Sequence, residues 1–504
     1  MCASPRDTTL ISEEVRQART LSQARSRSLP SVNGFLNVSI ERGECSTGVV
    51  ARRRLFAMKS RRHKDWALGL ILLVTYDAQA ADGALDTSFG DAGEVVFAPN
   101  DASLRGYSVA VQGDGNLLIG GERWAFALSP MEDQFAVWRY LADGKSDLGF
   151  GIAGLSAIAS APSYPVVYSL TQLPDGHILA AGTRGGFGVT RLNSDGSVDS
   201  AFGNAGLATL DFSDLDASAQ GALSLATDTE GRILLVGDAG YANNFYACAM
   251  ARLLPDGTPD ATFGQGGRVV IQPGPAAAPL NAVALGVALD SVGRIVVSGH
   301  VDAPTNSGLK SFLALRLLDN GSLDSTFGNA GIAINNSGIA TDDWANGVTI
   351  DADRIEIAGS CDPGSASAAL CMLRLDNNGN PDASFGNQGW ARVLLNFSLL
   401  RRVSAARQSD GKSLLLGTAN TSSPPRQFIA SRLNSDGSID LDFGDLGLAY
   451  ISVPVKDGGN VSANAISLQG GRPILVGTTD GVYYVSALVI ARLQSDLIFT
   501  SGFQ

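Results

Sequence analysis

One phrase recurs along this chain at a nearly constant spacing. Residues 191–203 read RLNSDGSVDSAFG and residues 432–444 read RLNSDGSIDLDFG, and looser copies occur between and around them. The steps between successive phenylalanines of the phrase, starting from Phe89, are 61, 52, 61, 64, 58, 58 and 60 residues. A period of about 60 residues indicates an array of repeated units rather than several unrelated domains. In each unit an arginine precedes the phenylalanine by eleven residues, and the pairs are Arg139 and Phe150, Arg191 and Phe202, Arg252 and Phe263, Arg316 and Phe327, Arg374 and Phe385, Arg432 and Phe443, and Arg492 and Phe503.

Each unit also carries a pattern typical of short antiparallel strands. An apolar run ends in glycine once per unit, as in ILLVG to Gly237 and IVVSG to Gly299, and these runs are too short for helices. A tight turn such as Asp114-Gly115 or Asp175-Gly176 precedes most of these runs, because a hairpin needs residues that tolerate positive φ. Further apolar runs precede the turn, follow the FGxxG phrase and lead to the repeat arginine. One unit therefore predicts four antiparallel strands, of which the first follows FGxxG and the last ends at the repeat arginine.

Seven such units predict an all-β protein, a seven-bladed β-propeller of four-stranded antiparallel blades. The phrase RLNxDGxxDxxFGxxG at this period resembles the delta-60 repeat β-propellers of secreted bacterial proteins, over about residues 84–503. The resemblance implies the fold but no established activity. The sequence departs from the pattern at Asp353-Arg354, which replaces the Asp-Gly turn, and at Leu497 and Thr500, which replace the usual Gly and Asp. We therefore expect a modified closure at the last blade.

The region before the repeats has the layout of a secretory signal peptide. A basic stretch from Lys59 to Lys64 is followed by an apolar stretch from Trp66 to Val74 and by Ala-Gln-Ala ahead of Ala81. A membrane anchor is the alternative, but a bilayer needs about 20 apolar residues. We expect residues 58–80 to be the signal peptide and residues 1–57 a mis-assigned or disordered extension. Residues 81–504 would then be one propeller, secreted or periplasmic.

Removal of residues 1–80 makes the chain strongly acidic. That segment holds 13 of the 37 Lys and Arg and 7 of the 49 Asp and Glu, which leaves 24 basic and 42 acidic residues and a net charge of 24 − 42 = −18. An acidic surface repels phosphate backbones, so nucleic acid is not expected as a partner. No membrane span is expected either. We therefore expect the partner to be a protein or a carbohydrate, and we expect the protein itself to be a monomer.

Three cysteines lie beyond the predicted cleavage site. Cys361 and Cys371 stand at the facing ends of the predicted second and third strands of unit five, where opposed Cβ atoms come within about 4.5–5.5 Å. We therefore predict a disulfide between them. By strand alternation Cys248 faces the other side of its strand, and we predict a buried free thiol there.

The repeated residues themselves are best explained as structure. We expect each phenylalanine to fill the gap between adjacent blades. We expect six of the seven arginines to pair with an aspartate eight residues later and so to tie the strand to the following turn; a ring of anion-binding arginines is the alternative. The aspartates are Asp147, Asp199, Asp260, Asp324, Asp382 and Asp440.

Signals for cofactors and catalysis are weak. The segment LDNNGNPD (375–382) alternates carboxylate and amide oxygens around a glycine and could hold calcium, but turn chemistry alone demands the same residues. We therefore expect no metal or other cofactor. His177 and His300 have no metal-ligand partner at useful spacing, and neither a G-x-S-x-G nor an H-E-x-x-H motif occurs. We expect both to be ordinary surface residues and predict no catalytic residue.

The length and content of the connections predict where a function would lie. The Asp-Gly and FGxxG connections emerge on one face, whereas the connections on the other face vary in length and content, as functional loops do. On that face we expect a binding or scaffold module, with an extracellular hydrolase or lyase and a structural envelope protein as the alternatives. Aromatic residues that fold back on the blade edge would be the structural explanation. The binding candidates, which we expect in the loops of that face with the aromatic residues exposed, are Trp124, Tyr241, Asn243, His300, Asp342, Asp343 and Trp344.

Overall fold

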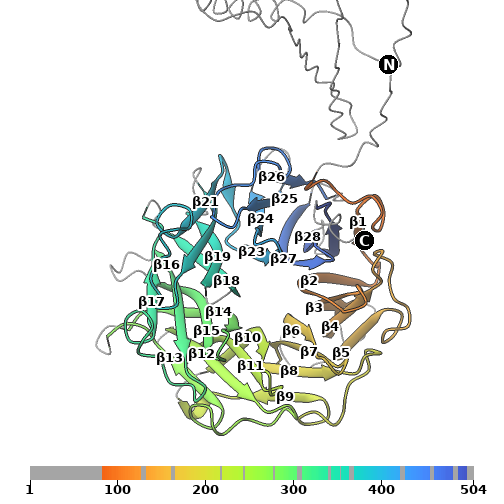
Figure 1. The fold of residues 1–504 in the computed structure, drawn as a ribbon. Helices are drawn as coiled ribbons and strands as arrows, with labels where there is room; N and C mark the ends of the chain where they lie inside the picture. Colours follow the sequence, from red (N-terminus) through yellow and green to blue (C-terminus); the bar gives the residue numbers. More distant parts are fainter. Residues whose placement is uncertain are drawn as a thin grey trace, which may run out of the picture. The chain divides into compact units, whose positions relative to one another are not determined.

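A computed structural model places the repeats in seven antiparallel sheets arranged as the blades of a β-propeller (Figure 1). The structure describes residues 82–126, 132–159, 165–184, 186–215, 218–241, 245–275, 279–302, 309–338, 342–351, 354–362, 368–420, 426–453, 459–480 and 486–495. The predicted extension and signal peptide lie outside these residues, as does Phe503. Within the described residues no helix is long and apolar enough to cross a membrane.

Each blade has an inner, a second, a third and an outer strand. The inner strands surround the centre of the ring (Figure 1). They are β2 (Ala102–Val111), β6 (Val166–Gln172), β10 (Ser218–Thr227), β14 (Ala282–Leu289), β18 (Asp343–Asp351), β22 (Ser398–Leu399) continued by β23 (Ser404–Arg407), and β27 (Asn460–Gln469). The second strands are β3 (Leu117–Ala125), β7 (Ile178–Thr183), β11 (Ile233–Gly240), β15 (Ile295–Asp302), β19 (Arg354–Cys361), β24 (Ser413–Asn420) and β28 (Arg472–Asp480).

The remaining strands complete the blades toward the rim. The third strands are β4 (Glu132–Tyr140), β8 (Phe187–Leu192), β12 (Tyr246–Leu253), β16 (Lys310–Leu317), β20 (Ala369–Leu375), β25 (Gln427–Leu433) and β29 (Ser486–Arg492). The outer strands are β5 (Leu155–Ala159), β9 (Leu207–Leu210), β13 (Arg268–Ile271), β17 (Ile332–Asn335), β21 (Trp390–Leu394), β26 (Leu448–Ile451) and β1 (Glu94–Phe97). A short 3-10 turn, η1 (Ser213–Leu215), follows β9.

The division of the repeat into blades differs from the sequence-based expectation. The strand after FGxxG does not begin a new blade but pairs with the third strand before it, as β5 pairs with β4 and β17 with β16. The blade is therefore offset by one strand from the repeat unit. The physical reason is that the turn from the repeat arginine to FGxxG is a local hairpin, which keeps the following strand in the same sheet.

Glycine and aspartate form the turns as predicted. Gly115 and Gly176 adopt φ of 86° and 93°, which strongly favours glycine. The carboxylates of Asp114 and Asp175 accept hydrogen bonds from the backbone N–H two residues later, at 2.9 and 3.0 Å. These contacts satisfy backbone donors inside the turn itself.

The phenylalanines of the repeat fill the space between blades, as predicted. Phe202 is fully buried and packs in one cluster with Leu179 of blade two and Leu235 of blade three. The glycine after each phenylalanine then joins two blades: the N–H of Gly328 donates to the carbonyl of Asn378 in the next blade, at 2.7 Å. Every blade is thus tied to its neighbour by the same buried ring and the same backbone contact.

The repeat arginines also behave as structural residues, and six of the seven pair with the predicted aspartate. Nε of Arg316 donates to Asp324 at 2.8 Å, and its guanidinium also donates to Oδ1 of Asn377 in the next blade at 2.9 Å. The link to the next blade was not predicted from the sequence. The other five pairs are Arg139 with Asp147, Arg191 with Asp199, Arg252 with Asp260, Arg374 with Asp382, and Arg432 with Asp440.

The last blade is closed by the beginning of the propeller. β1 pairs with β29, so blade seven contains both ends of the described chain (Figure 1). Arg492 donates to Asp86 at 2.8 Å, and its guanidinium carbon lies 4.8 Å from the ring centre of Phe89. The sequence paired Arg492 with Phe503; the partner is instead the first copy of the FG phrase, which therefore belongs to the last repeat.

The cysteines take the predicted states. Cys361 at the end of β19 and Cys371 on β20 form a disulfide with their Cα atoms 6.0 Å apart. Cys248 is a free, fully buried thiol, and burial raises its pKa. An inaccessible thiol with a raised pKa is a poor nucleophile, so Cys248 belongs to the core.

Candidate functional site

The two faces of the ring use their polar groups differently. The face with the Asp-Gly and FGxxG turns is here called the repeat face. There the arginines and aspartates of the repeat pair with each other, and backbone groups of the turns form hydrogen bonds between blades. The opposite face, here called the loop face, carries the connections between second and third strands and those from each outer strand to the next inner strand. Six of the seven predicted binding candidates lie toward the loop face, and the seventh, Asn243, lies outside the described residues.

The structure brings two of the candidates into direct contact. The rings of His300 and Trp344 lie 4.5 Å apart, between blades four and five. Arg401 places its guanidinium carbon 4.3 Å from the centre of the Trp344 ring, and Nζ of Lys310 lies 5.8 Å from that centre. Cations over the face of an indole are attracted by its quadrupole. We call these four residues the Trp344 cluster.

Two of these positions differ from the sequence-based expectation. His300 was expected at the surface of a loop, but it lies on β15 and is only 7% exposed. Trp344 was expected to be exposed, but it lies on β18 and is half-buried. The strands extend further toward the loop face than the apolar pattern indicated, because polar residues of one blade are covered by the next.

Two acidic candidates flank the cluster. Asp342 lies 3.8 Å from a guanidinium nitrogen of Arg401 and remains partly accessible. Asp343 was expected in a loop but is fully buried at the start of β18, where its carboxylate accepts hydrogen bonds from the backbone N–H and the hydroxyl of Ser337, at 2.6 and 3.0 Å. Burial raises the pKa of Asp343 while these hydrogen bonds oppose the rise. Asp343 therefore has a structural role.

The remaining aromatic candidates differ in accessibility. Trp124 is 40% exposed on β3 and packs edge-on against Phe126, with ring centres 5.4 Å apart. Tyr241 was expected to be exposed but packs against the core between blades two and three. Of the aromatic candidates, Trp124 is thus the one that presents a large surface to a ligand.

The buried His300 predicts a specific response to acid. Desolvation, and then the nearby Lys310, lower its pKa from 6.5 to about 4, against the opposing effects of the Ala345 backbone, Asp302 and Asp342. Between pH 6.5 and 4 the imidazole of His300 is protonated in the unfolded chain but neutral in the folded protein. The free energy of unfolding therefore falls as the pH falls through this range. We expect the free energy of unfolding to drop by about 2–3 kcal/mol more in the wild type than in His300→Gln between pH 7 and 4. Urea titrations at both pH values measure this difference, and an equal drop in both proteins would contradict the assignment.

A second group of residues lies around the axis of the ring. In the inner strands of six blades the register shifts at one corresponding position, and a bulge there re-aims a side chain. In blade six the inner strand is interrupted between β22 and β23. The side chains at these seven positions are all half-buried. They are Tyr107, Tyr168, Leu223, Leu285, Asn346, Arg402 and Asn464.

Two of these seven side chains serve the fold. Nδ2 of Asn464 donates to the carbonyl of Gly106 in blade one, at 2.7 Å. Oδ1 of Asn346 accepts from the backbone N–H of Val403 in blade six, at 2.9 Å. Both contacts join neighbouring blades at the inner strand, so the asparagines are accounted for as interblade links.

Three other side chains form an aromatic and cationic group, here called the axial cluster. Tyr107 of blade one and Tyr168 of blade two have ring centres 5.3 Å apart. The guanidinium carbon of Arg402, from blade six, lies 5.7 Å from the centre of the Tyr107 ring. Blade seven separates blades six and one, so Arg402 extends past it across the inner side of the ring. Burial lowers the pKa of Arg402 and raises that of Tyr107 to about 12, so the phenol keeps its proton at neutral pH.

Charged residues surround this axial cluster. Arg105 on β2 pairs with Glu122 on β3 at 3.0 Å, and burial raises the pKa of Glu122. Asp238 on β11 lies close enough to Tyr168 to raise the tyrosine's pKa, although burial is the larger cause. Desolvation raises the pKa of Asp238 itself to about 6. The surroundings thus hold one neutralised ion pair and one half-buried acid.

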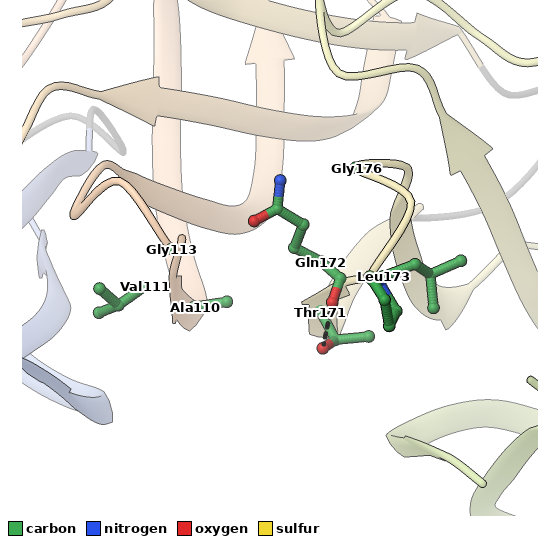
Figure 2. Close-up of a pocket in the computed structure, with 8 residues that line it drawn as sticks. Ala110, Val111, Gly113, Thr171, Gln172, Leu173 and Gly176 are labelled. Atoms are coloured by element: carbon green, nitrogen blue, oxygen red, sulfur yellow. Dashed lines mark hydrogen bonds between the residues drawn. The ribbon is translucent and has the colours of Figure 1, made fainter. Parts of the chain in front are cut away.

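Hollows on the repeat face lack comparable chemistry. Figure 2 shows one of about 440 Å³ between blades one and two, lined by residues such as Val111, Thr171 and Gln172 and by no charged side chain. A second, of about 460 Å³, includes Asp351 and Arg407, which bind each other at 2.6 Å. Neither hollow presents a charged group that is free to meet a ligand.

The calcium-like segment at residues 375–382 uses its first carboxylate within its own turn. Oδ1 of Asp376 accepts the backbone N–H groups of Asn378 and Asn380, at 2.9 and 2.8 Å. Within the ranges that the structure describes, no three His, Cys, Asp or Glu side chains gather as metal ligands would. The carboxylate of this turn thus serves the turn itself.

The axial cluster was missed by sequence reasoning. Its positions carry tyrosine, leucine, asparagine or arginine, so no shared residue type reveals them. A different position of the repeat does carry a signal for polar groups near the candidate site. The residue directly after the second-strand glycine is polar in every blade. These residues are Glu122, Thr183, Asp238, His300, Ser360, Thr418 and Thr478.

Comparisons with known proteins support a β-propeller repeat family. The model of a β-propeller domain of unknown function, DUF5122, matches residues 173–202, 231–263 and 408–443. No curated protein matches the chain.

Several solved structures are similar to the chain at low sequence identity. A catalytically inactive virginiamycin B lyase from Staphylococcus aureus with quinupristin is 11% identical, covers 80% of this chain and 99% of its own, and has a TM-score of 0.44. A mutant Trypanosoma rangeli sialidase displaying trans-sialidase activity is 11% identical over 81% of this chain and 57% of its own, with a TM-score of 0.37. A GH43_1 enzyme from Xanthomonas citri complexed with xylose is 12% identical over 80% and 90%, with a TM-score of 0.31. None of these likenesses indicates a function for this chain.

Proposed function

We propose that the protein is a secreted or periplasmic binding module that engages a carbohydrate or peptide ligand through its loop face. The division of labour between the two faces carries this proposal. On the repeat face the polar groups of the repeat are used in contacts within and between blades. The loop face presents the accessible side chains of Trp124, Arg401 and Asp342. The axial cluster adds further polar side chains near the axis of the ring. Tryptophan and arginine are enriched among the few residues that contribute most of the binding energy at an interface.

The test compares the two faces by mutation. We expect a Trp124→Ala/Arg401→Ala variant to lose tenfold or more in affinity for a ligand that the wild type binds on glycan and peptide arrays, since loss of a central contact costs at least about 1.4 kcal/mol. Leu441→Ala is the matched control, because Leu441 is 62% exposed in a repeat-face turn. Binding that survives the loop-face variant and is lost in the control would contradict the proposal.

A hydrolase or lyase is the alternative from the sequence. Such an enzyme would consume its array ligand, and mass spectrometry of the ligand after incubation would detect the product. A recovered, unchanged ligand with a loop-face-dependent Kd supports the binding module.

A further inference from the structure

We propose that the axial cluster is a binding site for the carboxylate of a small ligand with a flat apolar body, bound by Arg402 beside the contacting rings of Tyr107 and Tyr168. The proposal deepens and rests on the proposed function, because it names the chemistry that one part of the loop-face site would recognise. It is carried by the contacts of Arg402 and the two tyrosines.

The first observation is that Arg402 has no acceptor. Every repeat arginine binds a carboxylate, and neighbouring Arg401 lies near Asp342. By contrast, among the described residues Arg402 makes a ring contact with Tyr107 and neither a hydrogen bond nor an ion pair. A guanidinium carries five N–H donors in a planar fork that matches a carboxylate, and it remains charged even when partly desolvated. A half-buried fork without an acceptor is costly unless a ligand or solvent supplies one.

The second observation is that the tyrosines are positioned for a ligand rather than for the fold. Tyr107 and Tyr168 sit at register shifts, where an extra residue is turned out of the strand pairing. Their ring planes meet at 56°, and within the described part of the chain neither hydroxyl has a hydrogen-bond partner. The phenols therefore offer two donors beside the guanidinium. Bulged residues next to functional sites commonly re-aim side chains in this way.

The third observation concerns charge and polarity around the ring. At the corresponding positions of blades three and four stand Leu223 and Leu285, so the inner ring has an apolar part as well as the polar part. Glu122 is neutralised by Arg105, whereas Asp238 has no cationic partner among the described residues. An anion at Arg402 would thus feel one opposing charge, from Asp238, and this gives the site an electrostatic signature that can be tested.

The experiment uses benzoate as the probe and isothermal titration calorimetry of the full chain at pH 7.5. We expect a Kd on the order of 1 mM for benzoate and at least about tenfold weaker binding of benzamide, its neutral isostere. Inorganic phosphate is titrated in parallel. Arg402-dependent binding of phosphate but not of benzoate would overturn the assignment to a carboxylate.

Three variants locate the site. Arg402→Met should raise the Kd for benzoate by about tenfold or more, because a hydrogen bond to a charged group is lost. Asp238→Asn should tighten it about two- to fivefold by removing the opposing charge. Arg354→Met is the matched control: it removes an exposed arginine at the repeat-face end of β19, which pairs with Asp351 at 3.3 Å, and should leave the Kd unchanged.

The outcomes separate this inference from the proposed function. An equal Kd for benzoate and benzamide, or an effect of Arg354→Met as large as that of Arg402→Met, would overturn the axial site. If Arg402→Met unfolds, Asp238→Asn still decides, since an unchanged or weaker Kd in that variant is also contradictory. Loop-face-dependent array binding without benzoate binding would leave the binding module in place and remove only the carboxylate site.

Discussion

Replacing Arg316 with methionine should lower the free energy of unfolding by about 3–5 kcal/mol, since breaking a buried ion pair leaves the Asp324 carboxylate with Arg294, at 3.6 Å, as its remaining cationic partner. Arg316 is 1% exposed and binds Asp324 at 2.8 Å, Thr326 at 3.0 Å and Oδ1 of Asn377 at 2.9 Å. Its guanidinium carbon also lies 4.7 Å from the ring centre of Phe327. The substitution would leave the Asp324 carboxylate buried and would remove one tie between blades four and five. Urea-induced unfolding monitored by circular dichroism measures the loss.

The matched control is Arg139→Met. Arg139 makes the same pair with Asp147 at 2.7 Å, but its side chain is 16% exposed and water can replace the lost contacts. We expect a loss of about 1–2 kcal/mol there. Equal losses at both positions would contradict the view that burial, rather than the pair itself, sets the cost.

Replacing Phe89 with alanine should cost about 3–5 kcal/mol, as for other large-to-small substitutions in a packed core. Phe89 is fully buried in a cluster with Leu488 and Ile490 of β29, although some 400 residues separate them in the sequence. The ring therefore closes on a side chain from the opposite end of the chain. Loss of Phe89 leaves a cavity beside Arg492 and loosens blade seven.

Two controls frame this prediction. Phe327→Ala removes the equivalent ring in the middle of the chain and should cost a similar amount. Phe97 lies on β1, which follows the first FG phrase, but it is 43% exposed, and Phe97→Ala should cost less than about 1 kcal/mol. A small effect of Phe89→Ala beside a large effect of Phe327→Ala would mean that the first FG phrase stands outside the ring.

The repeat made the fold predictable because its signals are local. Strand length, Asp-Gly turns and the period of about 60 residues are read from neighbouring residues, and they suffice for seven four-stranded blades. The sequence does not reveal which strand lies innermost, because all four runs of a unit are apolar and the choice is set by packing between blades. The offset of the outer strand and the pairing of Arg492 with Asp86 therefore emerged from the structure alone.

The candidate site was predictable only in part. The loop face was identified from variable connections, and His300 and Trp344 do meet there. Their burial was not foreseen, because it depends on cover from adjacent blades. Arg402 and the two tyrosines come from three blades and share no motif, and a bulge leaves no consistent mark on residue type. Contacts across the centre of a ring are non-local, so a one-dimensional pattern does not contain them.

The central structural claim, that the ring is closed by pairing of the first and last described strands, is tested most directly by cross-linking β1 to β29. Val96 and Val489 are direct partners in the register, whereas Val95 pairs with Ile490 and points to the other face of the sheet. A Val96→Cys/Val489→Cys variant should form an intrachain disulfide, because directly opposed Cβ atoms lie within about 4.5–5.5 Å. Non-reducing peptide mapping should find the two ends linked in that variant and not in Val95→Cys/Val489→Cys. Equal linkage in both variants, or linkage only between molecules, would contradict closure by the N-terminal strand.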